Sequence, residues 1–270
     1  MLAFVVLAIT VLAAIFAPWL APYAPTDQTL TMRLTPPSWA EGGSADYLLG
    51  TDGLGRDILS RMIFGARVSL LVGLAAVLVQ GVTGVTLGLI AGYFGGWVDK
   101  LIMRIADVQL AIPFMVLAIA VMAVLGGGLR NVIIVLGITG WVTFGRVVRS
   151  QVLSLKQTEF VESARATGAS TARILVVHIL PNLVTSVLVM ATLQVARMII
   201  AEAALSYLGL GVQPPTPTWG GMVSDGRNWI SRAWWISTLP GIAILGTVLS
   251  INVLGDFIVD WLDPTTRRSA

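Results

Sequence analysis

Residues 68–98 read VSLLVGLAAVLVQGVTGVTLGLIAGYFGGWV and carry no charged side chain. About 20 predominantly apolar residues are enough for a helix to cross the hydrocarbon core of a bilayer, so this run is longer than one crossing needs. A strand of a membrane barrel would alternate apolar and polar residues, whereas this run is apolar on all sides. Because every backbone amide in hydrocarbon must be paired internally, we predict a membrane-spanning helix here.

Five further uncharged stretches lie on either side of this run. They are Leu2–Ala21, Val108–Leu129, Asn131–Gly145 with an extension past Arg146, Ile174–Ala196 and Ala233–Gly255. Only 11% of the 270 residues are charged, against about 25% in a soluble domain. We therefore predict an all-α, polytopic membrane protein with about six transmembrane helices. The stretch 203–224 is also uncharged, but its glycines and prolines predict an irregular or re-entrant segment.

Composition also excludes several classes of function. The chain has no cysteine and a single histidine, His178, so we predict no metal site built from thiolates or several histidines. The basic residues are spread between the apolar runs, whereas a nucleic-acid binder concentrates them in a patch. A P-loop needs a lysine after glycine, and neither Lys100 nor Lys156 has one. The chain therefore cannot hydrolyse ATP by a P-loop mechanism on its own.

The segment between the first two apolar runs is polar and rich in Pro and Gly. Apolar residues recur at helical spacing over residues 58–63, which predicts an amphipathic helix lying at the membrane interface. Asp57 and Arg61 are four residues apart and could pair on that helix.

The first apolar run, Leu2–Ala21, could instead be a signal peptide, but no basic residue precedes it. That missing basic start suggests that a short N-terminal tail is absent from this sequence.

Basic residues favour one orientation of the chain. The loop 146–173 is the densest short cluster, and it contains Arg146, Arg149, Lys156, Arg165 and Arg173. Basic residues in short loops near the ends of spans mark the cytoplasmic side. The rule favours a cytoplasmic loop and, with an even number of spans, cytoplasmic termini.

The same loop carries the most informative motif. It contains Glu159-Phe160-Val161-Glu162-Ser163-Ala164-Arg165-Ala166-Thr167-Gly168, and Leu180-Pro181 follow within the next apolar run. This predicts a short helix that Thr158 caps and Gly168 ends. The pattern resembles the loop of the membrane subunits of ABC importers, E-A-A, three residues, G, nine residues, I-x-L-P. Ser163 replaces the middle alanine of that pattern, and His178 replaces its isoleucine.

Other segments narrow the resemblance to one branch of these importers. Gly50-Thr51-Asp52, Gly55-Arg56-Asp57 and Ser60-Arg61 are similar to a signature of the dipeptide, oligopeptide and nickel permeases. The stretches 91–107 and 205–220 and the tail 255–264 also resemble this branch, although Val259 stands where the family often has arginine. The similarity covers nearly the whole chain and identifies it as a member of the C-type permeases of such systems.

The resemblance implies the following architecture. Residues 1–66 are the first transmembrane helix with an extracytoplasmic linker and the amphipathic helix. Residues 67–265 are the five-helix permease core of the type I importer fold, with a coupling loop at about 150–173. Residues 266–270 are a cytoplasmic tail. In the family, the loop helix docks into a groove on an ATPase subunit, which would make Glu159, Phe160, Glu162–Ala166, Gly168, Leu180 and Pro181 the coupling residues of this chain.

It also implies a multi-subunit importer in the cytoplasmic membrane of a prokaryote. The partners would be a homologous permease subunit, two cytoplasmic ATPase subunits that bind ATP and Mg²⁺, and an extracytoplasmic substrate-binding protein. This chain would be non-catalytic and hold no cofactor, and its cargo would be di- or oligopeptides. Nickel is the alternative cargo within the family. An ion-coupled secondary transporter is the alternative class, but we see neither an acidic relay nor an internal repeat. An intramembrane hydrolase is a third class, and the chain offers few side chains for one.

A last group of residues marks the expected outer end of the bundle. Arg197 and Glu202 flank the end of the fifth apolar run and could pair, either to hold the Gly- and Pro-rich segment or to contact the pathway. Pro214, Pro215, Trp219 and Gly220 lie in that segment. We predict that these six residues belong to an outer gate or to the contact with the binding protein.

Overall fold

The computed structural model describes residues 2–262, and within this range the regular structure is helical. The longer helices are α1 (Leu2–Ile15), α3 (Ile58–Phe94), α4 (Gly96–Leu110), α5 (Phe114–Leu125), α6 (Leu129–Thr139), α7 (Trp141–Leu155), α10 (Leu180–Tyr207) and α12 (Trp235–Leu262). The shorter ones are α2 (Ala17–Leu20), α8 (Glu159–Ala166), α9 (Thr171–Arg173) and α11 (Trp219–Gly226), with 3₁₀ turns at Leu30–Met32 and Arg227–Trp229 and a π-helical turn at Ile174–Ile179. The predicted tail 266–270, with Arg267 and Arg268, lies outside the described residues.

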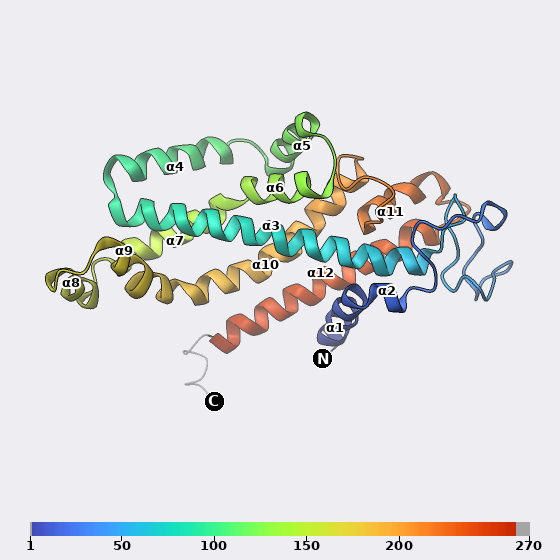
Figure 1. The fold of residues 1–270 in the computed structure, drawn as a ribbon, viewed down its shortest axis with the longest axis horizontal. Helices are drawn as coiled ribbons and strands as arrows, with labels where there is room; N and C mark the ends of the chain where they lie inside the picture. Colours follow the sequence, from blue (N-terminus) through green and yellow to red (C-terminus); the bar gives the residue numbers. More distant parts are fainter. Residues whose placement is uncertain (1, 263–270) are drawn as a thin grey trace.

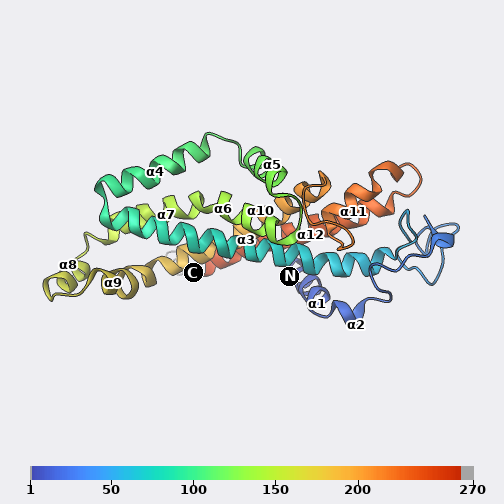
Figure 2. The same cartoon turned by 45° about the horizontal axis from the view of Figure 1, so that its top comes forward.

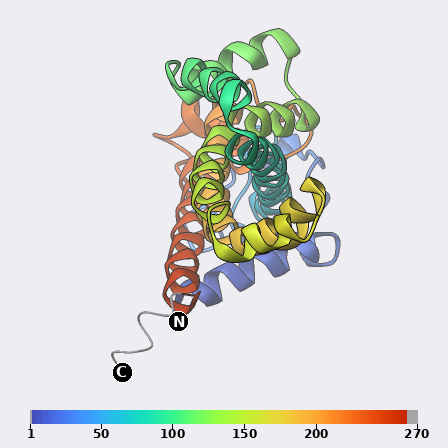
Figure 3. The ribbon, with the colours of Figure 1, turned by 90° about the vertical axis from the view of Figure 1, so that its left-hand side faces the viewer.

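Helix α3 lies along the long axis of the molecule, and α1, α4, α6, α7 and α10 pack against it (Figure 1). α8 and α9 lie at one end of this bundle, and the linker before α3 lies with α11 at the other end (Figure 1). α4 and α5 flank one side of the bundle and α1 and α2 the opposite side (Figure 2). Figure 3 looks along the bundle from the α8 end. The elongated shape keeps two clusters of functional residues far apart, one at each end.

The most extensive helix contact in the bundle is between α3 and α7, and glycines bring the two backbones close together. Gly84, Gly88 and Gly92 repeat every four residues and therefore share one face of α3. A Cβ on Gly84 would lie 2.5 Å from the carbonyl oxygen of Trp141, and a Cβ on Gly92 would lie 2.7 Å from Cβ of Val152. Small residues at such positions let two helix backbones approach within membranes, where there is no hydrophobic drive to pair.

Four segments are long and apolar enough to span a membrane, namely 58–94, 129–155, 171–207 and 235–259. They cover most of four predicted spans, although the predicted 68–98 extends four residues past Phe94 and the predicted 233–255 begins two residues before Trp235. The predicted span 108–129 falls largely on α4 and α5, which meet at an angle of 89° around Ala111, Ile112 and Pro113 and count as a fifth crossing if they form one broken span. The first predicted span is the shorter apolar helix α1 of 14 residues. Pro18, at the start of α2, follows the end of α1.

The prediction of a separate amphipathic helix over residues 58–63 is wrong. These residues are the first turns of α3, where Ile58 and Arg61 are buried, and α3 continues without interruption through the expected boundary at residue 66. Asp57 starts this helix, since its carboxylate accepts a hydrogen bond from the Ser60 amide at 2.7 Å. The helix contains no proline and continues to Phe94, and most of its glycines lie at close contacts with neighbouring helices.

The Gly- and Pro-rich stretch 203–224 is irregular only in its centre. α10 continues to Tyr207 and ends at Gly209, whose φ of 78° closes a left-handed C-terminal turn. In that turn the Leu210 amide donates to the Leu205 carbonyl and the Gly209 amide to the Ser206 carbonyl. Residues 208–218 then form the loop that leads to α11.

A matched pair of glycine substitutions tests the α3–α7 contact. Gly88→Ala would place a Cβ 2.7 Å from the carbonyl oxygen of Gly145, so we expect a loss of about 1–3 kcal/mol from overpacking. Gly81 lies on the same helix, but a Cβ there would meet nothing within 4 Å. Gly81→Ala should therefore leave stability unchanged or raise it slightly. Thermal unfolding in detergent measures both. Equal midpoints for the two variants would contradict the close contact.

Candidate functional site

Helix α8 stands on the end of the bundle with one face anchored. Val161 and Ala164 are its buried residues, and they belong to a cluster that includes Val148 and Val152 of α7 and Ile174 of the π-helical turn. They are three residues apart, which places them on the same side of the helix. The motif therefore forms the predicted helix, and its orientation is fixed by packing against the spans on both sides of the loop.

The other face of α8 is open. Its exposed residues are Glu159, Phe160, Glu162, Ser163, Arg165 and Ala166. The Phe160 side chain is 43% exposed, which leaves an aromatic ring at the tip of the molecule. Small side chains beside two carboxylates and one large ring form a surface on which a second protein could pack closely and in one orientation.

Both ends of α8 are fixed by local hydrogen bonds. Gly168 has a φ of 80° and ends the helix as predicted. The Ala169 amide donates to the Ala164 carbonyl and the Gly168 amide to the Arg165 carbonyl, which is the two-bond turn that glycine favours after a helix. The predicted side-chain cap by Thr158 is wrong, because its hydroxyl donates to the Leu155 carbonyl at 2.6 Å instead.

Two further contacts join the loop to the end of α3. The Arg165 guanidinium lies 5.9 Å from the ring centroid of Tyr93, within cation–π range. The ammonium group of Lys156 donates to the Gly92 carbonyl at 2.8 Å. α8 is therefore tied to α3, α7 and the start of the following span.

Leu180 and Pro181 lie apart from the open face of α8. They begin α10 directly after the π-helical turn at Ile174–Ile179, Leu180 half-buried and Pro181 exposed. Proline has no amide hydrogen and so removes one bond of the helix ladder. π-helical turns are often found at functional sites. This place in the fold makes both residues part of the joint between loop and span.

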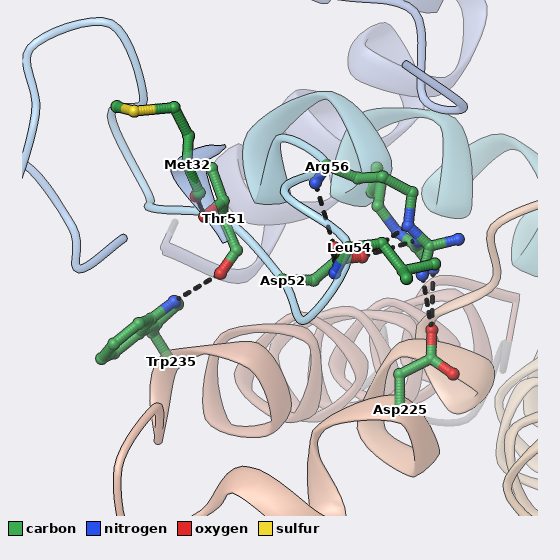
Figure 4. A network of polar contacts seen from close by, with 8 residues as sticks. Met32, Thr51, Asp52, Leu54, Arg56, Asp225 and Trp235 are labelled. Carbon is green, nitrogen blue, oxygen red and sulfur yellow. Dashed lines mark hydrogen bonds and ion pairs between the residues drawn. The ribbon is translucent and has the colours of Figure 1, made fainter. Parts of the chain in front are cut away.

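At the opposite end, the signature residues form a buried polar network around Asp52 (Figure 4). Asp52 is 2% exposed. One of its oxygens accepts from the amides of Leu54 at 2.8 Å and Arg56 at 3.0 Å, and the other from Arg56 Nε at 2.6 Å and Arg61 Nη1 at 2.9 Å. A buried carboxylate with four donors is compensated for the loss of water.

Asp225 of α11 completes the network. It accepts from Arg61 at 3.0 Å and from Arg56 at 3.3 Å, and it was not among the predicted residues. Arg61 pairs with Asp52 and Asp225, so the predicted pair between Asp57 and Arg61 is wrong. Asp57 instead caps α3 and accepts from the hydroxyl of Ser60.

The remaining signature residues hold the linker against the bundle. The Thr51 carbonyl accepts from the indole of Trp235 at 3.1 Å (Figure 4), and the Thr51 hydroxyl donates to the Met32 carbonyl. Gly55 has a φ of 73°, and a Cβ there would lie 2.0 Å from the Thr29 carbonyl oxygen. Gly50 likewise has a positive φ of 79° and closely approaches Thr35. The signature therefore joins the linker, α3, α11 and α12.

The predicted pair between Arg197 and Glu202 is wrong. Glu202 is fully buried and accepts from Ser69 of α3 at 3.1 Å and Ser206 at 2.6 Å. Arg197 is exposed and donates to Gln194 at 3.3 Å. Five residues along a helix place two side chains on different faces. The two predicted partners therefore lie in different environments, Glu202 inside the bundle and Arg197 on an exposed face of α10.

Four more predicted residues lie around the loop 208–218. Pro214 and Pro215 are exposed and line a cavity of about 300 Å³ together with Arg56 and Arg61. Trp219 and Gly220 are buried. The Trp219 indole donates to the Met62 carbonyl at 3.0 Å, and a Cβ on Gly220 would lie 2.3 Å from the Ala203 carbonyl oxygen. The prolines are therefore free for a partner, whereas Trp219 and Gly220 pack α11 onto the bundle.

A larger cavity opens beside the break between α4 and α5. Its volume is about 520 Å³, and its walls come from the α4–α5 break, the α6–α7 junction and the C-terminal half of α10. The polar lining residues are Gln109, Thr139, Thr143, Gln194 and Arg197. Gln109 donates to the Thr139 carbonyl and accepts from the indole of Trp141 at 2.9 Å. These two bonds hold α4 against the α6–α7 junction. Among residues 2–262, no group of acidic or histidine side chains is placed to hold a metal ion.

Comparison with known proteins agrees with these features. Residues 84–268 match the family described as binding-protein-dependent transport system inner membrane component. The chain belongs to this family. Residues 1–37 match the N-terminal transmembrane domain of oligopeptide transport permease C.

Full-length relatives of this inner membrane component are close in sequence. The di/tripeptide transport system permease DppC of Pseudomonas aeruginosa is 48% identical over 96% of this chain and 86% of its own length. The glutathione transport system permease GsiD of Escherichia coli is 48% identical over 98% of this chain and 85% of its own length. A chain of the MetNI methionine ABC transporter, solved in inward-facing conformations, has a TM-score of 0.61 at 19% identity over 76% of this chain and 98% of that one.

Family membership and fold establish the general role. The chain is a non-catalytic, membrane-spanning permease component of a binding-protein-dependent ABC transporter, and this membership implies partners that hydrolyse ATP and bind substrate. The predicted importer permease fold is confirmed by the match to the methionine transporter.

Removing the central carboxylate of the Asp52 network tests its structural role. Asp52→Ala leaves Arg61 buried with fewer partners, so we expect a loss of about 3–5 kcal/mol and faster proteolysis of the linker. Thermal unfolding and limited proteolysis in detergent measure the two effects. Asp46→Ala, an exposed acid in the same linker, is the control. An Asp52 variant as stable and protease-resistant as this control would contradict the network.

Proposed function

We propose that this permease component carries di- and oligopeptides into the cell. The observation that supports this cargo most strongly is the 48% identity, over 96% of this chain, to a permease named for di- and tripeptides. A second relative at the same identity is named for glutathione, which is chemically a tripeptide. Nickel is the alternative cargo from the family resemblance.

The working importer is a complex in which this chain pairs with a homologous permease. Two cytoplasmic ATPase subunits bind ATP and Mg²⁺, and an extracytoplasmic binding protein delivers the peptide. The absence of a P-loop lysine from this sequence supports an energy source on other chains. The mostly open face of α8 supports docking of an ATPase at that end.

α8 transmits closure of the ATPases to the spans. Glu159, Phe160 and Glu162 contact the ATPase groove and orient the helix, while Ser163 and Ala166 allow close approach. The buried contacts of Val161 and Ala164 with α7 and the π-helical turn support this transmission, because a helix packed on two spans moves them as it moves.

The α8 end is cytoplasmic and the Asp52 end is extracytoplasmic. Most of the basic residues in the loop 146–173 lie toward the α8 end, in agreement with the positive-inside rule. α12 begins beside the Asp52 network, where Trp235 donates to Thr51, and runs toward the α8 end (Figure 1), which supports a cytoplasmic end for this helix. Pro214 and Pro215 then face the binding protein, and the 520 Å³ cavity is this subunit's half of the translocation path.

Purification and reconstitution test the function. A tagged chain from native membranes should bring two P-loop ATPases, or two copies of one, and a second permease. With its binding protein, this complex in liposomes should take up a radiolabelled dipeptide when ATP is supplied and accumulate no ⁶³Ni²⁺. Uptake of nickel alone would favour the alternative cargo. Uptake by the lone chain along an ion gradient would favour a secondary transporter and contradict the proposal.

Two substitutions on the open face of α8, one that reverses a charge and one that adds a large basic side chain, test the docking site. Glu162→Lys and Ser163→Arg should leave thermal stability unchanged, since both residues are exposed, but should abolish recovery of the ATPases and at least 90% of uptake. Lys100→Glu, an exposed charge reversal on α4, is the matched control and should retain both. Because the ATPases are cytoplasmic, the same result also assigns the side of α8. Normal ATPase recovery with both α8 variants would contradict coupling through this face.

A further inference from the structure

The side chain of Arg197 lines the 520 Å³ cavity within a membrane-spanning segment. It lies ten residues before the end of α10, or about 15 Å along the helix axis. A guanidinium has five N–H donors, and within residues 2–262 its one hydrogen bond goes to Gln194 and it forms no ion pair. A cation at membrane depth is costly, and such residues commonly mark the route of a substrate.

A chain of amides fixes the position of Arg197. Gln194 accepts from Arg197 at 3.3 Å and donates to the side-chain oxygen of Gln80 at 3.2 Å. Gln80 is fully buried and donates in turn to the Leu136 carbonyl at 2.9 Å. The chain of bonds runs from α10 through α3 to α6. The bond to Gln80 orients the Gln194 amide so that its oxygen faces the guanidinium.

The lining of the cavity is suited to a molecule with an anionic end and an apolar body. No carboxylate is among the residues that line it, and most of the wall is apolar, including Phe114, Met115 and Met198. An arginine binds a carboxylate through two parallel N–H···O bonds. A peptide has one terminal carboxylate beside side chains that are frequently apolar.

We infer that Arg197 binds the C-terminal carboxylate of a peptide while it passes through the cavity. This inference rests on the proposed peptide transport and adds a selectivity element within the membrane, separate from selection by the binding protein. The contact must be strong enough to admit the carboxylate and weak enough to release it. The exposed position of Arg197, at the open wall of the cavity, fits such an intermediate affinity.

The test compares a dipeptide with its C-terminal amide in the reconstituted importer. Each ligand is supplied at a concentration that saturates the binding protein, as measured by titration. Peptide uptake and ATP hydrolysis are measured in the same sample. Arg197→Gln should lower uptake of the free acid about tenfold, leave uptake of the amide unchanged, and lower the ratio of uptake to hydrolysis for the acid. Arg197→Lys should retain part of the preference because it keeps the charge. Arg67→Gln, another exposed arginine of a membrane helix, is the control.

The outcomes separate this inference from the function on which it rests. If the unmodified importer transports no dipeptide, the proposed function fails. If it transports the dipeptide but Arg197→Gln reduces acid and amide equally, Arg197 has a structural role or pairs with the second permease, and the inference is overturned. Unchanged uptake per ATP with Arg197→Gln also overturns it.

Discussion

The contact between α3 and α7 determines how the two ends of this molecule are connected. Helix α3 has 37 residues and is about 55 Å long. It begins at the Asp52 network and ends beside α8. Because Gly84, Gly88 and Gly92 bring the backbone of α7 against α3, the two helices pack as one unit along the second half of α3. The linker is attached to this unit through Arg61, and the loop of α8 through the bond from Lys156 to Gly92.

Polar side chains inside the bundle act as links between helices. Hydrocarbon offers no water to an amide or carboxylate, so each such group is stable only where another part of the protein supplies its partner. Gln80 joins α3 to α6, Gln109 joins α4 to the α6–α7 junction, and Glu202 joins α10 to Ser69 of α3. Two of these links, those of Gln80 and Gln109, lie near the α6–α7 junction, where the helix is broken. There they specify the arrangement of broken helices, which apolar packing alone would leave less defined.

The sequence revealed the features that depend on local chemistry. The α8 helix, its end at Gly168 and most of the spans follow from short-range spacing and helix breakers, and the motif spacing was enough to recognise the family. Pairings between charges did not follow. Asp57 with Arg61 and Arg197 with Glu202 are near neighbours in sequence, but the partners found are Asp52 and Asp225 for Arg61 and Ser69 for Glu202.

The failures share a physical cause. Asp225 lies 164 residues from Arg61, and only the packing of α11 onto α3 brings them together. The same packing buries the first turns of α3. The pattern of residues 58–63 therefore predicts a helix at the membrane interface, whereas the structure places these residues inside the protein. The sequence offered one indirect signal, since Asp225 directly follows the uncharged Gly- and Pro-rich stretch that was predicted to be irregular or re-entrant.

Coupling and selectivity meet in the two helices that flank the α8 loop. α7 starts directly after Gly140, at the wall of the 520 Å³ cavity, and ends at Leu155, three residues before Thr158, which precedes α8. α10 runs from the π-helical turn packed against α8 to Arg197 on the facing wall. A shift of α8 driven by the ATPases would therefore reach both walls, one through α7 and the other through α10. In the proposed mechanism the hydrolysis cycle changes the distance between Arg197 and the Thr139–Gly140 wall, so that the carboxylate is held in one state and released in the next.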